Sequence, residues 1–237
     1  MLFAFVTTVP TTRLLLCFKN SKISSGVFIL SSKMKIMTNA AQARIESLEK
    51  QIDNSEIVSI VPTDTVYGII ADATNEEAIK KVYMAKRRSF SKPLIIMVSS
   101  IEMLKRYVKN ISDVEKRLIE KYWPGRLTIL FKRNNKISDF LTNSGDYIGI
   151  RLPDNKELCK LMNMLNKPLV STSANISDNM TITEISMLED ELKNNISYIV
   201  DGGMLNDLPS TLIKVEDEKI IFLREGELAS NIRKDFQ

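Results

Sequence analysis

Six clusters of cationic and hydroxyl side chains indicate where this sequence could do chemistry. Arg offers a bidentate fork, Lys a point charge, and Ser and Thr short donors, so these residue types together suit an anion, particularly a phosphate. Several clusters lie at the ends of apolar runs, and ligands of α/β proteins collect at strand ends. The six are PTDT at 62–65, AKRRSFSKPL at 85–94, Arg151 in IRLPD, STSAN at 171–175, PST at 209–211 and Arg224 in FLREG.

Histidine is absent from the 237 residues, and this narrows the possible chemistry. Ser-His-Asp and Cys-His catalysis and HExxH zinc sites are excluded, so proton transfer must use carboxylates, Lys, Tyr, substrate groups or water. The two cysteines, Cys17 and Cys159, argue against a disulfide scaffold or structural zinc and favour a reducing compartment. Neither GxGxxG nor a P-loop motif occurs, so a phosphate would need another cradle.

Each cluster taken alone also has an ordinary structural interpretation. Lys86 and Arg88 would follow a helix, where surface cations offset the helix dipole. STSAN could be a loop with Ser and Asn turn bonding, and PTDT could be a turn fixed by Asp64. A single cluster therefore does not decide the function.

Strand-like and helix-like runs alternate along the chain and predict a mixed α/β sheet that would position these clusters. A strict βαβ order is not expected, because 127–133 and 147–153 are two strands joined by a loop. The other predicted strands are 56–62, 93–99, 168–173 and 197–203, with a hairpin over 211–224 that turns at Glu216–Glu218. Helices are predicted over 40–53 and 155–165, and after the capping pairs Thr74/Glu77, Ser99/Glu102, Ser112/Glu115 and Thr181/Glu184.

The first residues differ in composition from the rest. Residues 1–44 hold six of the 33 Lys and Arg side chains and none of the 29 Asp and Glu, so the remainder is slightly acidic. We expect residues 1–39 to be a leader, either a mitochondrial transit peptide or a disordered tail, and 40–237 to be one catalytic domain. LLLCF leaves a secretory signal as a rival, and initiation at Met34 or Met37 would give a cytosolic form. The expected location is therefore mitochondrial, cytoplasmic or both, and no apolar run in the sequence is long enough to span a membrane.

Taken together and in order, several motifs resemble the YrdC-type threonylcarbamoyl-AMP synthase family. They are PTDTVYGI, KRRSFSKPL, WPGRLT, IRLP, STSAN and a late ST…LREG, which cover nearly the whole body of the chain. Lys86-x-Arg88 and Ser173-x-Asn175 match the basic and polar signatures of that family. The resemblance is to the short, single-domain form, and it implies an open twisted mixed α/β sheet with flanking helices and a concave basic cavity.

The resemblance also implies a nucleotidyltransferase reaction. L-Threonine, bicarbonate and ATP would give threonylcarbamoyl-AMP and pyrophosphate, the first step of tRNA threonylcarbamoyladenosine modification. A partner transferase would then pass the group to tRNA, which this protein could itself bind weakly. Mg²⁺ is expected with ATP, held largely by phosphate oxygens and water, with no metal ligand assigned to the protein.

Site residues carried over from the resemblance fall on the clusters above. The basic side chains near the nucleotide phosphates would be Lys86, Arg88 and Lys92, the first two catalytic. The nucleotide and carbamate would contact Ser171, Ser173 and Asn175, and Arg224 would approach the nucleotide. Threonine would contact Thr65, Arg151 and Ser210, with Arg151 forking its carboxylate. In this interpretation the hydroxyls that interrupt the PTDT strand are left for the substrate.

Two positions depart from the family pattern. Met97 stands where members often have a histidine near the threonine, and Arg126 in WPGRLT replaces a commoner proline, which we expect to be a turn variation only.

Two alternatives remain open at this stage. One is a non-catalytic RNA-binding module, which the slightly acidic body and the lack of an aromatic stacking platform weaken. The other is the carbamoyl-adenylate chemistry of hydrogenase-maturation relatives, which carry additional domains.

Overall fold

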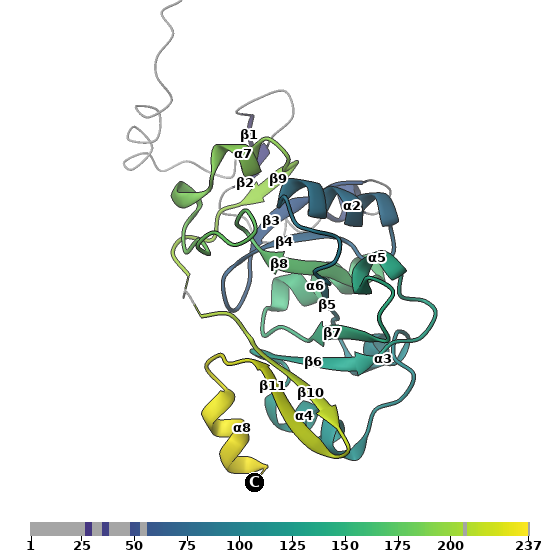
Figure 1. Ribbon diagram of the computed structural model, residues 1–237. Helices are drawn as coiled ribbons and strands as arrows, with labels where there is room; N and C mark the ends of the chain where they lie inside the picture. The colour runs from purple at the N-terminus through teal and green to yellow at the C-terminus, as the bar shows by residue number, and fades with distance from the viewer. Residues whose placement is uncertain (1–26, 30–34, 38–47, 53–55, 206–207, 237) are drawn as a thin grey trace, which may run out of the picture.

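A single mixed sheet organises the protein, as seen in a computed structural model that describes residues 27–29, 35–37, 48–52, 56–205 and 208–236 (Figure 1). Among these residues the sheet has 11 strands in the order β1-β2-β9-β3-β4-β8-β5-β7-β6-β10-β11. The strands are β1 (Val27–Ile29), β2 (Lys35–Met37), β3 (Ser59–Pro62), β4 (Tyr67–Asp72), β5 (Ile95–Met97), β6 (Leu127–Lys132), β7 (Tyr147–Arg151), β8 (Leu169–Ser173), β9 (Tyr198–Val200), β10 (Thr211–Glu216) and β11 (Lys219–Arg224).

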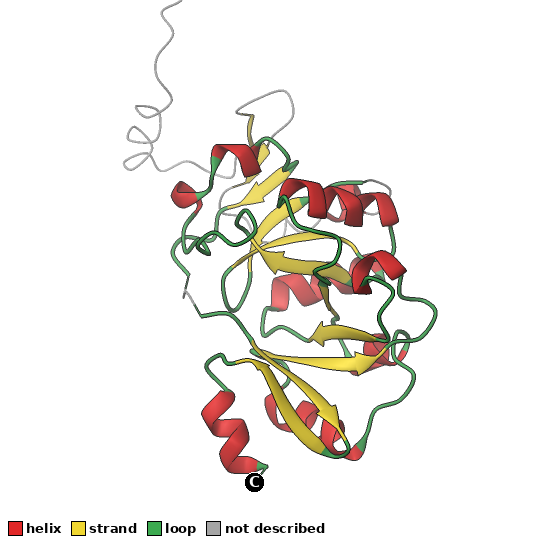
Figure 2. Ribbon diagram, in the orientation of Figure 1, coloured by secondary structure: helices red, strands yellow, loops and turns green. Residues whose placement is uncertain are grey.

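The helices lie beside this sheet along its length (Figure 2). They are α2 (Glu76–Ala85), α3 (Ile101–Lys105), α4 (Asp113–Tyr122), α5 (Asp139–Thr142), α6 (Lys156–Leu165), α7 (Asp190–Lys193) and α8 (Ala229–Asp235), with a 3₁₀ turn η3 (Ile185–Met187). Residues 48–52 are also helical and belong to the helix predicted over 40–53, the rest of which lies outside the described residues. None of the described helices is long and apolar enough to cross a membrane.

The strand pairing is mixed, as the sequence predicted. β3 and β4 form an antiparallel hairpin, β5 runs parallel to β7, and β6 is antiparallel to β7. β10 is parallel to β6 and antiparallel to β11, which confirms the predicted hairpin. The hairpin turns at Asp217 and Glu218, whose φ angles are 49° and 62°.

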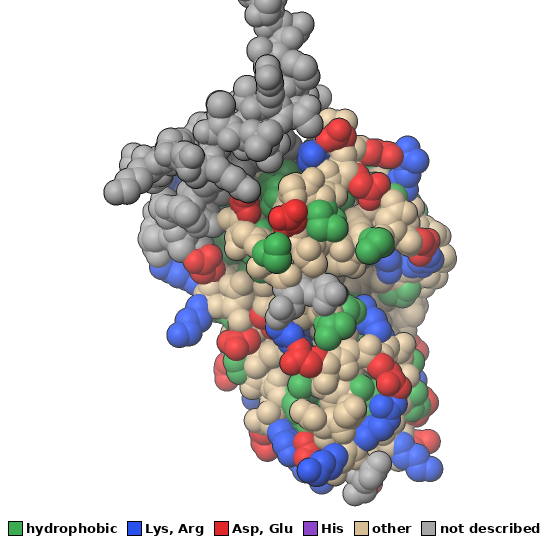
Figure 3. All heavy atoms as spheres, turned by 90° about the vertical axis from the view of Figure 1, so that its left-hand side faces the viewer, with side chains coloured by type: hydrophobic (Ala, Val, Ile, Leu, Met, Phe, Trp, Pro, Cys, Tyr) green, Lys and Arg blue, Asp and Glu red, His purple; other side chains and the backbone are tan. Residues whose placement is uncertain are grey.

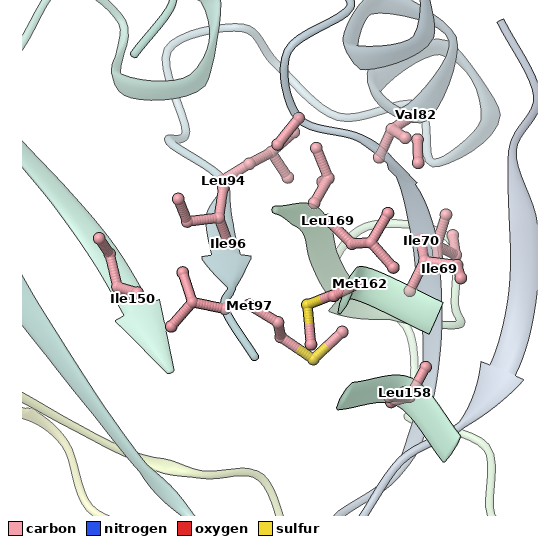
Figure 4. Close-up of a cluster of buried hydrophobic side chains, with 14 of the residues drawn as sticks. Ile69, Ile70, Val82, Leu94, Ile96, Met97, Ile150, Leu158, Met162 and Leu169 are labelled. Carbon is pink, nitrogen blue, oxygen red and sulfur yellow. The ribbon is translucent and has the colours of Figure 1, made fainter. Parts of the chain in front are cut away.

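Aliphatic strands form the core of the domain. β4 is buried along its whole length, a pattern typical of a strand covered on both faces. α6 packs on the sheet with its apolar side, and Met162 of this helix points toward Met97 of β5 (Figure 4). Met97 is 1% exposed. The side chain at the usual histidine position therefore belongs to the core.

Two predicted helix starts are displaced by one residue. Asn75, rather than Thr74, caps α2, because its Oδ1 accepts hydrogen bonds from the two backbone amides at Glu77 and Ala78. Thr74 instead donates its hydroxyl to Asp72 at 2.6 Å. Both residue types can cap a helix, so only the backbone geometry decides between neighbours.

The remaining capping predictions have different outcomes. Ser100, rather than Ser99, caps α3. The capping box of Ser112 and Glu115 at α4 is confirmed, with both reciprocal hydrogen bonds present. The helix start expected at Thr181 is wrong: a 3₁₀ turn, η3, comes first, the Glu184 side chain before it makes no cap hydrogen bond, and the α-helix α7 begins only at Asp190.

Two strands come from the segment that we expected to be a leader. β1 and β2 pair with each other, and β2 pairs in parallel with β9 through three residue pairs. Most of residues 1–39 lies outside the described residues. The leader and the domain boundary at residue 40 therefore stay predictions.

Candidate active site

The strand register places several candidate residues on one side of the sheet. Ser171 of β8 lies opposite Ile95 of β5, which lies opposite Gly149 of β7. Residues that pair directly share a face, and so do residues two apart along a strand. Ser173 and Arg151 therefore face the same side as Ser171, with β5 between their strands.

Lys86 is buried where α2 ends. Its side chain is 1% exposed, and Nζ donates to the backbone oxygens of Ser173 and Asn175 at 2.5 and 2.6 Å and to Asn175 Oδ1 at 3.2 Å. Burial and, to a lesser extent, the nearby charge of Arg88 lower the Lys86 pKa to about 7, while the charge of Glu189 opposes them. The alternative of a surface cation that only offsets the helix dipole is therefore wrong for Lys86.

Arg88 and Lys92 form the outer part of this site. Arg88 donates from Nε to Lys92 O at 3.0 Å and from Nη2 to Pro93 O at 2.9 Å, and burial lowers its pKa. Lys92 Nζ contacts both carboxylate oxygens of Asp178 at 3.0 Å. Within the described residues, neither Lys86 nor Arg88 forms an ion pair, so the hydrogen bonds of both cations go to neutral acceptors. The positive charge of these two side chains is therefore not neutralised by a protein carboxylate, which suits the binding of an anion.

An aromatic contact holds the loop that carries these cations. Phe90 lies against Tyr83 and Phe140, with ring centroids 4.7 and 6.2 Å apart. The Tyr83 hydroxyl donates to Lys92 O at 3.2 Å and to Phe140 O at 3.0 Å. Sequence reasoning missed this support, although an aromatic residue inside a basic loop was the available signal.

The PTDT loop between β3 and β4 satisfies its own polar groups. The hydroxyls of Thr63 and Thr65 lie 2.9 Å apart, and Thr63 Oγ1 donates to Val66 O at 2.7 Å. Arg151 Nη1 donates to Thr65 Oγ1 at 3.1 Å, and Nη2 pairs with Asp64. The expectation that substrate must satisfy these hydroxyls is wrong, and the alternative of a turn fixed by Asp64 describes the loop better.

Arg151 is the buried centre of this region. It is 5% exposed, its Nη1 and Nη2 are engaged, and its Nε has no hydrogen-bond partner in the part of the chain that the structure describes. Burial lowers its pKa, Asp64 opposes this, and the charge of Arg126 adds to the lowering. The other oxygen of Asp64 accepts the backbone N–H of Asp154 at 3.1 Å, so the carboxylate is fixed from two sides.

Ser210 and Arg224 complete the same region from the C-terminal hairpin. The Ser210 hydroxyl lies 2.7 Å from that of Thr128. Arg224 donates from Nε to Ser210 O at 2.9 Å and from Nη2 to Ser210 Oγ at 3.0 Å. Burial lowers the Arg224 pKa, and the neighbouring charge of Arg151 adds to this. The guanidinium group of Arg224 therefore lies at Ser210 and within electrostatic range of Arg151.

The predicted site residues thus form two groups. We call Lys86, Arg88, Ser173 and Asn175 the lysine cluster, with Lys92 at its edge and Ser171 on the same strand. We call Thr65, Arg151, Ser210 and Arg224 the arginine cluster. Asp64 and Thr128 belong to the second group and were not predicted as site residues. In the described ranges, no group of three His, Cys, Asp or Glu is placed to hold a metal ion.

Sequence comparison places these clusters in a known context. A family model for Sua5, YciO and YrdC proteins, described as telomere recombination, matches residues 50–226. A Methanocaldococcus jannaschii protein with the provisional name threonylcarbamoyl-AMP synthase is 43% identical over 183 residues, which are 77% of this chain and 85% of that protein. A Pyrococcus abyssi threonylcarbamoyl-AMP synthase is 32% identical over 70% of this chain and 49% of its own length. The chain spans about half the length of this relative and of the Bacillus subtilis synthase.

Solved structures share the fold. P. abyssi Sua5 complexed with L-threonine matches 84% of this chain and 58% of its own, with a TM-score of 0.76 and 28% identity. Escherichia coli YciO matches 81% of this chain and 93% of its own, with a TM-score of 0.72 and 23% identity, and bears on the fold alone. The predicted fold class is confirmed.

Proposed function

Because this chain belongs to the Sua5, YciO and YrdC family, we propose that it is a threonylcarbamoyl-AMP synthase. Such an enzyme joins L-threonine, bicarbonate and ATP to give threonylcarbamoyl-AMP and pyrophosphate. The observation that carries the proposal is the lysine cluster: Lys86 is buried beside Arg88, and the hydrogen bonds of both go to neutral acceptors. Every predicted site residue lies within the matched range 50–226.

The reaction mainly requires that the protein position the substrates and supply fixed positive charge. The threonine amine and bicarbonate condense to a carbamate with loss of water. A carbamate oxygen then attacks the α-phosphorus of ATP, and the bond from this phosphorus to the bridging oxygen of pyrophosphate breaks. Negative charge grows on the transferred phosphate and on the leaving group, and preorganised cations stabilise it. Lys86 and Arg88 supply two such cations, and a histidine base is not needed.

The lysine cluster is assigned to the nucleotide. Ser173 and Asn175 fix Lys86 through their backbone oxygens, so its ammonium has a defined position before ATP binds. Lys92 exchanges its exposed pairing with Asp178 for a phosphate at low cost, because exposed ion pairs are weak. Ser171, from the same strand as Ser173, contacts the nucleotide or the carbamate.

The arginine cluster is assigned to threonine and to the nearby part of the nucleotide. Thr65 and Ser210 present hydroxyls held by Arg151 and Arg224 respectively. The expectation that Arg151 forks the threonine carboxylate stays a prediction. Both Nη atoms have protein partners in the structure, Thr65 and Asp64, so the carboxylate would have to replace them. Arg224 approaches the nucleotide in this assignment.

Mg²⁺ enters as part of the substrate MgATP. Phosphate oxygens and water are ligands that this ion prefers. The cations and hydroxyls of the lysine cluster suit the phosphates rather than the metal, so the donor set fits a nucleotide that brings its own ion.

The threonylcarbamoyl group then goes to a partner transferase that modifies tRNA. A mitochondrial or cytoplasmic location is proposed from the composition of residues 1–39 alone.

The first test uses the purified chain with MgATP, bicarbonate and threonine. We expect pyrophosphate release and a threonylcarbamoyl-AMP product that both depend on threonine. Arg88→Ala should lower the rate about 100-fold, as does loss of one charge-stabilising donor in other enzymes. Arg87→Asn is the matched control: it removes the neighbouring exposed cation, and Asn tolerates the positive φ of 49° at this position.

The competing RNA-binding function predicts a different result from the same proteins. On the face shown in Figure 3, basic and acidic side chains are mixed rather than separated into a large basic field. An RNA module would make no product, and Arg88→Ala would instead reduce its salt-dependent RNA affinity. A folded wild-type chain that binds ATP but releases no threonine-dependent pyrophosphate would overturn the synthase proposal.

A further inference from the structure

Glu189 lies at the start of α7 and is joined by hydrogen bonds to the turn formed by residues 176–179. Its Oε1 accepts the backbone N–H of Ile176 at 3.4 Å, and both of its carboxylate oxygens accept from Nδ2 of Asn179 at 3.1 Å. The backbone N–H of Asn179 also donates to Ile176 O at 3.1 Å, which closes the turn. One carboxylate therefore holds both ends of this turn.

The same turn holds the side chain of Asn175. Nδ2 of this residue donates to Ile176 O at 2.9 Å and to Asn179 O at 2.7 Å. Asn175 is buried, and its Oδ1, at the other side of the amide, accepts from Lys86 Nζ at 3.2 Å. A continuous set of hydrogen bonds therefore runs from Glu189 through the turn and Asn175 to the Lys86 ammonium.

The charge of Glu189 also acts on Lys86. Glu189 raises the Lys86 pKa, against the lowering by burial and by Arg88. Two exposed ion pairs neutralise other charges of this region, Lys92 with Asp178 and Arg87 with Glu191. Over the residues that the structure describes, Glu189 itself forms no ion pair. Its negative charge therefore remains available to favour the protonated form of Lys86.

We propose that Glu189 is a positioning residue of the lysine cluster, which holds the 176–179 turn and, through Asn175, fixes the Lys86 ammonium where the nucleotide phosphates bind. Its negative charge has a second effect, because a nearby carboxylate favours the charged lysine that an anion requires. The inference rests on the proposed function for the assignment of this cluster to ATP.

The pH dependence of ATP affinity tests both effects. The dissociation constant for MgATP is measured by titration calorimetry from pH 6 to pH 9 for wild type, Glu189→Ala and Glu189→Gln. Glu189→Ala removes the acceptor of the turn, so its dissociation constant should rise about tenfold already at pH 6, as for the loss of a hydrogen bond to a charged group. Glu189→Gln keeps an oxygen that can accept from Asn179, so it should recover most of this loss at pH 6.

The glutamine variant then isolates the charge. Without the carboxylate charge, Lys86 loses its proton at a lower pH than in wild type. The ATP affinity of Glu189→Gln should therefore begin to fall at a lower pH, and the gap to wild type should widen as pH rises. A direct repulsion between Glu189 and ATP would have the opposite sign, since both variants would then bind ATP more tightly, and that result would overturn the inference.

Asp190→Asn is the matched control. Asp190 is the next acidic residue of the chain, but it is exposed and pairs with Lys193 of the same helix. Its ATP affinity and the pH dependence of this affinity should equal those of wild type.

Thermal unfolding shows which variants are folded, and the glutamine variant decides the question if the alanine variant does not fold. Wild-type ATP affinity in folded Glu189→Ala, or the wild-type pH curve in folded Glu189→Gln, would overturn the inference. Threonine-dependent pyrophosphate release is measured separately on the same preparations. Its absence from a wild-type chain that binds ATP would overturn the synthase proposal, while the ATP titrations would still decide the role of Glu189.

Discussion

At the scale of single residues, Lys86 couples burial to function. Burial and Arg88 lower its pKa to about 7, against an ordinary value of 10.5. A neutral lysine gives a phosphate no positive charge, so ATP binding must favour the protonated form. As pH rises above 7, a growing fraction of the free protein lacks this proton, and in that fraction ATP binding has to restore it.

We therefore predict that ATP binding takes up a proton above about pH 7, towards the ordinary lysine pKa of 10.5, and that ATP affinity falls as pH rises through this range. Titration calorimetry at pH 8 in two buffers of different ionisation heat measures the uptake directly. Lys86→Met fills a similar volume without charge and should bind ATP weakly at every pH, with no proton uptake. Equal heats for wild type in both buffers would contradict the assignment of Lys86 to the phosphates.

Sequence reasoning found the residues of the lysine cluster but not the partners in the arginine cluster. Lys86 and Arg88 are close in the chain, and so are Ser173 and Asn175, so local spacing was informative. Asp64 and Arg151 are 87 residues apart, and nothing local to either one indicates the other. The buried ion pair, and with it the satisfied hydroxyls of the PTDT loop, needed the three-dimensional structure.

At the scale of elements, the strands were easier to predict than the helix ends. Runs of buried Ile, Val and Leu define the strands, because burial on both faces leaves no room for polar residues. The starts of α2 and α3 were wrong by one residue, since adjacent Ser, Thr and Asn side chains can all cap a helix. No expectation was made for α5 or α8, whose short runs carry little periodicity.

The segment after the β10–β11 hairpin leads to a test at this scale. A Cβ on Gly226 would lie 2.6 Å from Pro209 O and 2.7 Å from Thr211 N, the backbone atoms on either side of Ser210. Gly226→Ala should therefore displace Ser210 and with it Arg224. We predict a stability loss of about 1–3 kcal/mol, the usual cost of overpacking, and at least a tenfold drop in kcat/KM.

Gly203→Ala is the comparison for this prediction. Gly203 has a φ of +79°, but a Cβ there would meet no atom within 4 Å. The cost should be only the backbone strain, about 1 kcal/mol, with activity retained. Denaturant unfolding and steady-state rates measure both quantities. If Gly226→Ala kept full activity, the close approach would not position the arginine cluster.

At the scale of the whole molecule, the question is whether the catalytic domain needs the strands from the predicted leader. Removing β2 would expose the edge of β9, the strand with which β2 pairs. It is also held from the other side by β3, by Ser197 N donating to Val58 O at 2.9 Å, and by Gly202 N donating to the Tyr67 hydroxyl at 2.9 Å. The family match begins at residue 50, after β1 and β2.

We therefore predict that removing residues 1–39 leaves a chain that unfolds in one cooperative transition and keeps its KM values. The exposed edge of β9 can pair with another chain, so we expect the shortened protein to associate more at high concentration. Thermal unfolding, product formation and light scattering, each compared with the full chain, measure the three effects. Loss of cooperative unfolding or of product would mean that β1 and β2 belong to the catalytic domain, and its boundary would then lie before residue 40.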